Sequence, residues 1–221
     1  MAETIVKPKK FTVEWFLYIW DYYKMHILVF LAVVALTVIT IVDIVNTVEY
    51  DLNINYVATN IFPFQCEQQL AEMASKRIED INDDEERNVS FSQLNFTDEV
   101  LQDGNQIMTL ENKRMILFAS EDEMLYIFDE FMLKNSLDMP AAEGIFVPVQ
   151  HWVNPENANT SFYEYKEGMY AASLADSKLL AELGEESSDM YVVVRMNYFP
   201  ENVELEKRYE NCVAFANMLL E

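Results

Sequence analysis

The longest uncharged stretch of the chain lies near its amino end. Residues 27–42 contain no charged side chain and only two polar ones, Thr37 and Thr40, and the apolar character continues to residue 48. At about 1.5 Å per residue, a helix over residues 27–48 is about 33 Å long, enough to cross a hydrocarbon core of about 30 Å. In such a core every backbone polar group must bond within its own helix. The stretch therefore predicts one transmembrane helix over residues 25–48; the alternative is a buried helix of a globular core.

The flanks of this stretch predict a retained anchor and its orientation. The apolar run begins late and exceeds the roughly 7–15 residues of a cleavable signal peptide, and no small-residue cleavage site follows it. The first base after it is Lys76. The bases before it are Lys7, Lys9, Lys10 and Lys24. The positive-inside bias then predicts a single-pass protein of the cell membrane, with residues 1–24 in the cytoplasm and residues 49–221 outside.

An aromatic segment precedes the predicted membrane helix. Residues 11–23 hold seven aromatic side chains in thirteen positions, and Phe11, Trp15, Tyr18 and Tyr22 recur at helical spacing. Tryptophan and tyrosine rings are favoured at the level of the lipid headgroups, so the segment predicts an amphipathic helix that lies in the interface. A docking surface for the membrane helices of a partner is the alternative.

Beyond residue 50, short apolar segments of two different periods alternate. Alternation of period two, or a short apolar run, predicts strands over residues 51–58, 88–96, 115–119, 146–149, 162–165, 169–174 and 190–197. A spacing of three to four predicts helices after Pro63, over residues 120–133, over residues 178–183 and over residues 203–220. The second of these follows a capping box, Ser120 to Glu123, and the third ends at Gly184. This alternation predicts an α/β domain, a mixed sheet with helices on its faces.

Composition excludes several classes of protein. Of the 221 residues, 51% are hydrophobic and only ten are glycine or proline, which excludes a disordered chain. The 38 acids and 15 bases give a net charge of −23, so a sequence-independent nucleic-acid binder is excluded, because such binding needs clustered lysine and arginine. Two cysteines and two histidines are too few for a zinc module. We expect no metal and no cofactor.

Two features leave alternatives open. Cys66 and Cys212 each fall on the apolar face of a predicted helix, which fits either two buried thiols or a disulfide that closes a large loop. Residues 79–87 form the densest acidic run, without the residue order of a calcium loop. The run fits either a solvated helix end and turn or a weak site for a divalent cation.

The order of the predicted elements resembles a loose group of membrane-anchored proteins of Gram-positive anaerobes that have no assigned function. The segments that carry this resemblance are residues 20–24, which read WDYYK, residues 115–133 and residues 168–184. The outer domains of that group are similar to one lobe, or a reduced version, of a solute-binding protein. The resemblance implies an extracytoplasmic α/β domain behind a signal anchor.

Candidate binding residues follow from the predicted sheet, because open α/β sheets bind ligands beyond the carboxyl ends of their strands. These candidates are Thr59 and Asn60 after the first strand, Asn95 and Thr97 after the second, and Ser120 and Glu121 after the third. The chain carries no nucleophile elbow, Walker loop, dinucleotide fingerprint or zinc-protease motif, so we expect no enzyme and no catalytic residue.

The function predicted from these patterns is that of a membrane-anchored, non-enzymatic extracytoplasmic module. It would act as an accessory or interaction subunit of a membrane or envelope assembly, with the lipid bilayer and another membrane or surface protein as its partners. The alternative is a tethered solute-binding receptor associated with a transporter.

Overall fold

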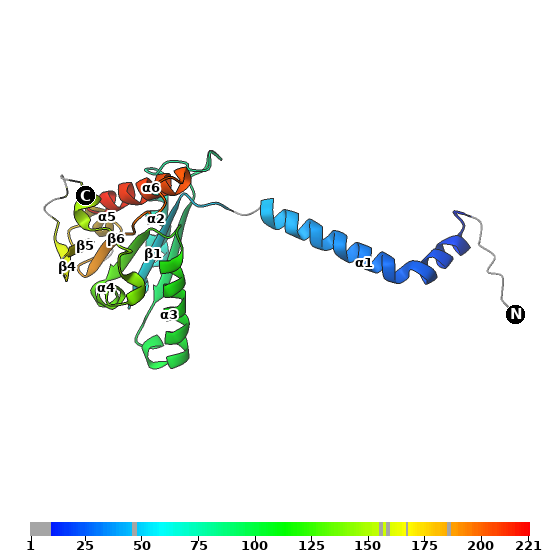
Figure 1. Ribbon diagram of the computed structural model, residues 1–221, viewed down its shortest axis with the longest axis horizontal. Helices are drawn as coiled ribbons and strands as arrows, with labels where there is room; N and C mark the ends of the chain where they lie inside the picture. Colours follow the sequence, from blue (N-terminus) through cyan, green and yellow to red (C-terminus); the bar gives the residue numbers. More distant parts are fainter. Residues whose placement is uncertain (1–9, 46–47, 155–156, 158–159, 167, 185–186) are drawn as a thin grey trace. The chain divides into compact units, whose positions relative to one another are not determined.

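The computed structural model divides into two compact units, Met1–Val48 and Glu49–Glu221 (Figure 1). It describes residues 10–45, 48–154, 157, 160–166, 168–184 and 187–221. Of the lysines that predict the orientation, Lys7 and Lys9 lie outside the described residues. The first unit is one long helix, and the second carries the sheet.

The apolar stretch near the amino end forms the helix α1 (Val13–Val45). Its 33 residues make it about 50 Å long, and it is long and apolar enough to cross a membrane. None of the residues in its most apolar window is buried. The hydroxyls of Thr37 and Thr40 donate at 2.9 Å to carbonyl oxygens four residues earlier. Both polar interruptions are thereby satisfied within the helix, as lipid requires.

The aromatic segment belongs to the same helix. Residues 11–23 were expected to form a separate helix in the interface, but from Val13 onward α1 continues without a break into the apolar stretch, and its ribbon is bent along its course (Figure 1). The rings of Tyr18 and Tyr22 stack with their centroids 6.2 Å apart. This contact, between residues four apart, places both rings on one side of the helix, as their spacing predicts.

The second unit is built on a six-stranded mixed sheet with the order β2-β1-β3-β6-β5-β4. Its strands are β1 (Leu52–Ala58), β2 (Val89–Asn95), β3 (Leu125–Asp129), β4 (Phe162–Tyr165), β5 (Gly168–Ser173) and β6 (Met190–Val194). β1 pairs in parallel with β2 and with β3, and β3, β6, β5 and β4 pair antiparallel in succession. The predicted α/β class with a mixed sheet is confirmed.

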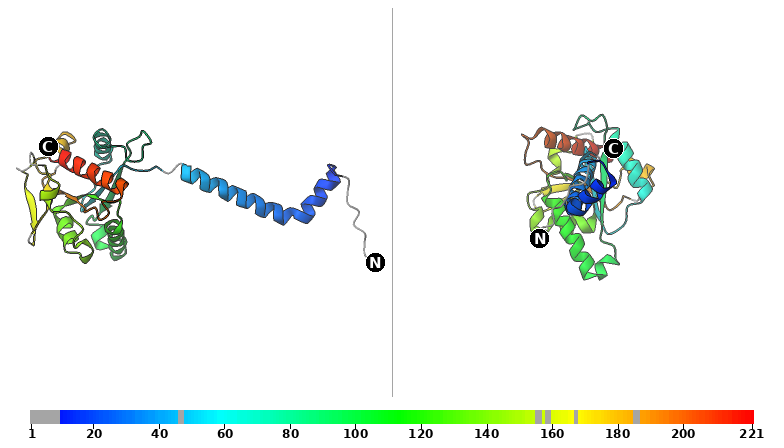
Figure 2. Two further views of the ribbon diagram at one scale, coloured as in Figure 1. Left: turned by 45° about the horizontal axis from the view of Figure 1, so that its top comes forward. Right: turned by 90° about the vertical axis from the view of Figure 1, so that its right-hand side faces the viewer.

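Helices cover both faces of this sheet (Figure 2). They are α2 (Phe64–Ser75), α3 (Gly104–Ala119), α4 (Glu130–Leu137), α5 (Lys178–Glu182) and α6 (Val203–Leu219). α2, α5 and α6 contribute to one buried apolar cluster, and α3 and α4 contribute to the other. Successive residues of a strand point to opposite faces, so Ile127 of β3 joins the first cluster and its neighbours Tyr126 and Phe128 join the second. The domain is therefore a three-layer structure with a core on each side of the sheet.

The segment after β2 contradicts two of the predicted elements. Residues 115–119, predicted as a strand, are the last turns of α3. This helix begins well upstream, where the Asp103 carboxylate accepts hydrogen bonds from the backbone N–H groups of Asn105 and Gln106. Its buried positions, Arg114 and Phe118, are four residues apart. The apolar run was wrongly predicted as a strand because the helical period of the polar residues before it was not recognised.

Residues 120–133, predicted as a helix, contain β3 and only the start of α4. All five residues of β3 are buried, which is typical of a central strand covered on both faces and leaves no alternation to recognise. The Tyr126 hydroxyl lies 3.0 Å from the carbonyl oxygen of Leu117 and 2.9 Å from that of Glu123. These contacts tie the end of α3 to the start of β3. The apparent capping box therefore lies in the turn between them.

The last third of the chain follows the prediction more closely. One predicted element in this part is wrong, the strand over residues 146–149. Only one bridge forms there, between Phe146 and Arg195, and Pro148 then leads into a 3-10 turn. Ser177 caps α5 by accepting from the backbone N–H of Leu180, and Gly184 follows the C-cap of that helix with φ +81°, as predicted.

The conformation of Gly184 gives a test of this local structure. Replacing Gly184 with alanine forces a side chain into the left-handed region, although no atom lies within 4 Å of the added Cβ. We expect the free energy of unfolding to fall by about 1–2 kcal/mol, measured by chemical denaturation of the full-length protein in detergent. Gly104→Ala is the matched control, because its Cβ also meets nothing within 4 Å and its φ is not positive. Equal free energies of unfolding of the two variants would contradict a left-handed conformation at Gly184.

Candidate functional site

The carboxyl ends of the parallel strands bring together only some of the predicted binding residues. Thr59 and Asn60 follow β1, Asn95 ends β2 and Thr97 lies two residues beyond it. Ser120 and Glu121 do not belong to this edge. Because residues 115–119 are helical, Ser120 is the C-cap of α3, and both residues precede β3 at the opposite edge of the sheet.

A buried carboxylate that the sequence did not single out organises this edge. Asp129, the last residue of β3, is 3% exposed. Its Oδ2 accepts from the backbone N–H and from the hydroxyl of Thr59, both at 2.6 Å. Its Oδ1 accepts from the backbone N–H of Met132 at 2.7 Å and so caps α4. Thr59 and Asp129 therefore join the ends of β1 and β3, which is a structural role.

The neighbouring loop residues are also occupied by structure. The Tyr56 hydroxyl donates to the side-chain oxygen of Asn60. The Tyr56 ring lies 5.2 Å from that of Phe62, which in turn stacks on Phe91 of β2 at 5.3 Å. The Thr97 carbonyl accepts from Leu101 N–H at 2.9 Å and starts the turn before α3. Thr59, Asn60 and Thr97 thus shape this edge of the sheet.

Asn95 lines a shallow groove of about 450 Å³ between β2 and the first turns of α3. The groove is lined by Gln93, Asn95, Val100, Asn105, Gln106, Thr109 and Leu110. Asn95 Nδ2 donates to Gln93 Oε1 at 3.2 Å, and Asn95 Oδ1 is buried without a partner among the described residues. The groove presents amides and a hydroxyl without a charge, so it suits an uncharged polar group.

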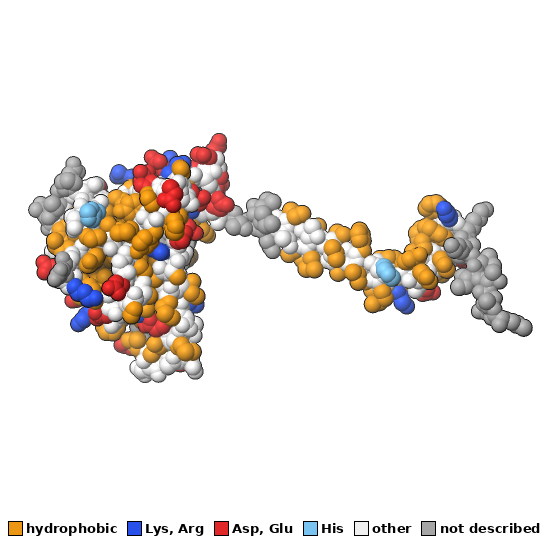
Figure 3. Space-filling model, in the orientation of Figure 1, with side chains coloured by type: hydrophobic (Ala, Val, Ile, Leu, Met, Phe, Trp, Pro, Cys, Tyr) orange, Lys and Arg blue, Asp and Glu red, His pale blue; other side chains and the backbone are white. Residues whose placement is uncertain are grey.

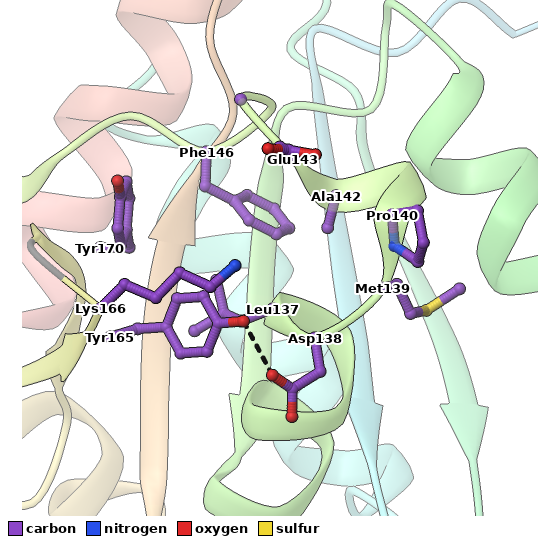
Figure 4. A pocket seen from close by; sticks show the side chains of 11 residues that line it. Leu137, Asp138, Met139, Pro140, Ala142, Glu143, Phe146, Tyr165, Lys166 and Tyr170 are labelled. Atoms are coloured by element: carbon purple, nitrogen blue, oxygen red, sulfur yellow. Dashed lines mark hydrogen bonds between the residues drawn. The ribbon is translucent and has the colours of Figure 1, made fainter.

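A second cavity, of about 380 Å³, lies over the other half of the sheet (Figure 4). It is bounded by the end of α4, by the 3-10 turn Pro140–Ala142 and by the turn between β4 and β5. Its buried apolar wall is formed by Leu137, Ala142 and Phe146. The rings of Tyr165 and Tyr170 and the charged groups of Asp138, Glu143 and Lys166 complete its lining.

The charged groups of this cavity are held by aromatic contacts. The Tyr165 hydroxyl donates to Asp138 Oδ1 at 2.7 Å, the dashed bond in Figure 4. The Lys166 ammonium lies 4.8 Å from the centroid of the Tyr165 ring. Interaction with the Tyr165 phenol, followed by the charges of Glu143 and Asp138, raises the pKa of Lys166. Lys166 is therefore cationic at neutral pH, beside two carboxylates.

The pattern of the sequence does not predict this cavity. Its charged residues lie in turns that no periodic pattern marks, and three separate segments meet only because β5 pairs with β6 next to β3. The signal that the sequence does offer is a pair of tyrosines, Tyr165 and Tyr170, one in each of the predicted strands over residues 162–165 and 169–174.

The acidic run and the cysteines also have structural partners. The Asp80 carboxylate accepts from the backbone N–H groups of Asp83 and Glu85, so the run organises its own turn. Within the part of the chain that the structure describes, no group of three or more histidine, cysteine, aspartate or glutamate side chains is arranged to hold a metal ion. Cys66 and Cys212 are buried thiols; the Cys66 thiol donates to the Leu183 carbonyl at 3.4 Å, and burial raises the pKa of the Cys212 thiol to about 12.

Glu123 is the perturbed carboxylate of the opposite edge. Burial raises its pKa, and hydrogen bonding by Asn55 Nδ2 at 2.7 Å acts in the opposite direction, as do the charges of Arg208 and Arg195. Glu123 lines neither cavity. Its carboxylate accepts from the side-chain amides of Asn53 and Asn55 on β1, which is a structural role.

No protein family, curated protein or solved structure compared with the chain matches it.

The hydrogen bonds by which Asp129 connects β1, β3 and α4 can be tested by substitution. In Asp129→Asn an amide N–H group replaces one of the two acceptor oxygens, so one of the backbone donors of Thr59 and Met132 loses its partner. We expect the free energy of unfolding to fall by about 2–3 kcal/mol in chemical denaturation. Asp98→Asn is the control, since Asp98 is exposed and follows β2 at the same edge. A loss no larger than that of the control would show that Asp129 does not join the strands.

Proposed function

We propose that this chain is a membrane-anchored, non-enzymatic module whose α/β domain lies outside the cell and contacts another membrane or surface protein of an envelope assembly. Its resemblance to anchored proteins of Gram-positive anaerobes belongs to the same proposal. The apolar helix α1 supports the anchor, and the lysines before it support the orientation. The observation that carries the interaction is the exposed face of α3.

α3 leaves an apolar stripe uncovered. Met108, Met115 and Ile116 are 60%, 43% and 68% exposed, and their spacing of seven and one places them on one side of the helix. Asn112 lies between them, so the stripe carries no charge in a chain of net charge −23. Hydrophobic side chains are visible at the surface over α3 in Figure 3. A contiguous exposed stripe of this kind is typical of a protein-binding surface.

A substitution in the stripe tests the interaction. Ile116→Glu places a carboxylate at the most exposed residue of the stripe. In membranes cross-linked before detergent extraction, we expect the partners recovered with the full-length chain to fall at least about tenfold. Val203→Glu is the matched control, because Val203 is 71% exposed at the start of α6. Equal recovery with both variants would contradict docking through α3.

The orientation is tested separately. Because its basic flank is expected to stay in the cytoplasm, protease added to intact cells should remove a tag at the carboxyl end and spare a tag at the amino end. Permeabilised cells, in which both tags are digested, are the control. Protection of the carboxyl-terminal tag in intact cells would overturn the outward placement of the domain.

A tethered solute receptor is the second candidate function, and the cavity of Figure 4 is the observation that favours it. Its volume of about 380 Å³ lies within the range of about 300–1,000 Å³ that is usual for small-molecule sites. It also combines an apolar wall with a few convergent polar groups, which is the usual composition of such sites.

A further inference from the structure

The cavity of Figure 4 presents charged groups of both signs beside an apolar surface. Asp138 and Glu143 supply two carboxylates from the end of α4 and the following turn, and Lys166 supplies an ammonium from the turn between β4 and β5. From this arrangement we propose that the cavity binds a small zwitterionic solute of the amino-acid class. The inference rests on the second candidate function, the tethered receptor, and names its class of solute.

The acidic side of the cavity can receive an ammonium group. The Tyr165 hydroxyl bonds Asp138 Oδ1 and so orients that carboxylate at the cavity. Within the described part of the chain, Asp138 Oδ2 and the Glu143 carboxylate accept no side-chain hydrogen bond and form no salt bridge. These oxygens are acceptors for the three N–H donors of a primary ammonium.

The basic side can receive a carboxylate. Lys166 has φ +53°, in the left-handed region, and its ammonium lies over the face of the Tyr165 ring at 4.8 Å. Its hydrogen bond with the Tyr165 phenol uses one of its three N–H donors, and contact with the aromatic face uses none. The ammonium therefore keeps donors for a ligand while the ring holds it in place.

The walls of the cavity are held by the local backbone. A Cβ on Gly168 would lie 2.8 Å from atoms of the Tyr170 ring, so glycine is what allows that ring to lie against the turn. Gly144 has φ +78°, and its carbonyl accepts from the Tyr198 hydroxyl, which ties down the turn that carries Glu143. Fixed walls lower the entropic cost of ordering the site when a solute binds.

A zwitterion matches this set of groups better than a solute with one charge. A simple amine would gain the carboxylates but approach Lys166, and a simple carboxylate would gain Lys166 but approach Asp138 and Glu143. An amino acid pairs its ammonium with the acidic side and its carboxylate with Lys166. Its side chain then contacts the apolar wall of Leu137, Ala142 and Phe146.

The test uses three probes with one apolar body. Phenylalanine carries both charges, phenethylamine only the ammonium and 3-phenylpropanoate only the carboxylate. Isothermal titration of the full-length protein in detergent micelles should show phenylalanine binding at least about tenfold more tightly than either of the other two. Equal binding of phenethylamine, or no binding of any probe, would overturn the inference.

Substitutions locate the site. Lys166→Met should weaken phenylalanine binding at least about tenfold and leave phenethylamine binding unchanged or stronger, because only the carboxylate partner is lost. Glu143→Gln should weaken both ligands. The controls are Lys134→Met and Glu164→Gln, which change the same charges at exposed residues outside the cavity. Weakening by the controls equal to that of the cavity variants would show that net charge, and not the cavity, determines binding.

The outcomes also separate this inference from the function on which it rests. If an uncharged solute such as glucose binds in place of all three probes, and Tyr170→Ala, which removes a half-buried ring of the lining, abolishes that binding, the receptor function stands and the zwitterion is wrong. If neither glucose nor any probe binds, both are rejected, while docking through α3 is judged by its own experiment.

Discussion

The complete burial of β3 is the constraint on which the domain depends. All five of its residues are buried, and it is paired in parallel with β1 on one side and antiparallel with β6 on the other. It therefore joins the two halves of the sheet, and its alternate side chains enter the two cores. The polar side chains of such a strand need hydrogen-bond partners beyond the strand. The Tyr126 hydroxyl bonds a carbonyl at the end of α3, and the Asp129 carboxylate accepts from Thr59 after β1 and from the first turn of α4.

The same constraint explains which parts of the fold the sequence predicts. β1 was recognised because Leu52, Ile54 and Tyr56 alternate with asparagines, although six of its seven residues are buried. α6 was recognised because one of its faces lies in the core, so that its helical period is visible. β3 was missed because a strand buried on both faces has no alternation, and its apolar residues adjoin those of α4. α3 was missed for the opposite reason: only Arg114 and Phe118 are fully buried, so its period is weak. Burial on both faces conceals a strand that lacks alternating polar residues, as in β3, and sparse burial conceals a helix, as in α3.

For the candidate binding residues, the sequence predicts where along the chain they lie but not which residues contact them in the fold. The rule that sites follow the ends of parallel strands placed Thr59, Asn60 and Asn95 at one edge of the sheet, where the structure has them, but it cannot distinguish a ligand contact from a structural one. Thr59 is bonded by Asp129, which comes from 70 positions further along the chain, and this pairing follows only from the strand order. The cavity of Figure 4 depends on strand order to an even greater extent, because its three segments are adjacent only through β6 and β5.

The net negative charge affects the stripe on α3 and the cavity of Figure 4 differently. The domain over residues 49–221 carries 34 of the chain's 38 acids and 11 of its 15 bases, so the potential around it is negative, which repels an acidic partner and attracts any cation. The stripe on α3 carries no charge of its own, so the proposed docking there would depend on apolar contact. The cavity lies within the field, and its carboxylates alone would accept many cations. Discrimination between a zwitterion and a simple amine then depends on Lys166. Its ammonium repels the amine and forms an ion pair with the carboxylate of the zwitterion.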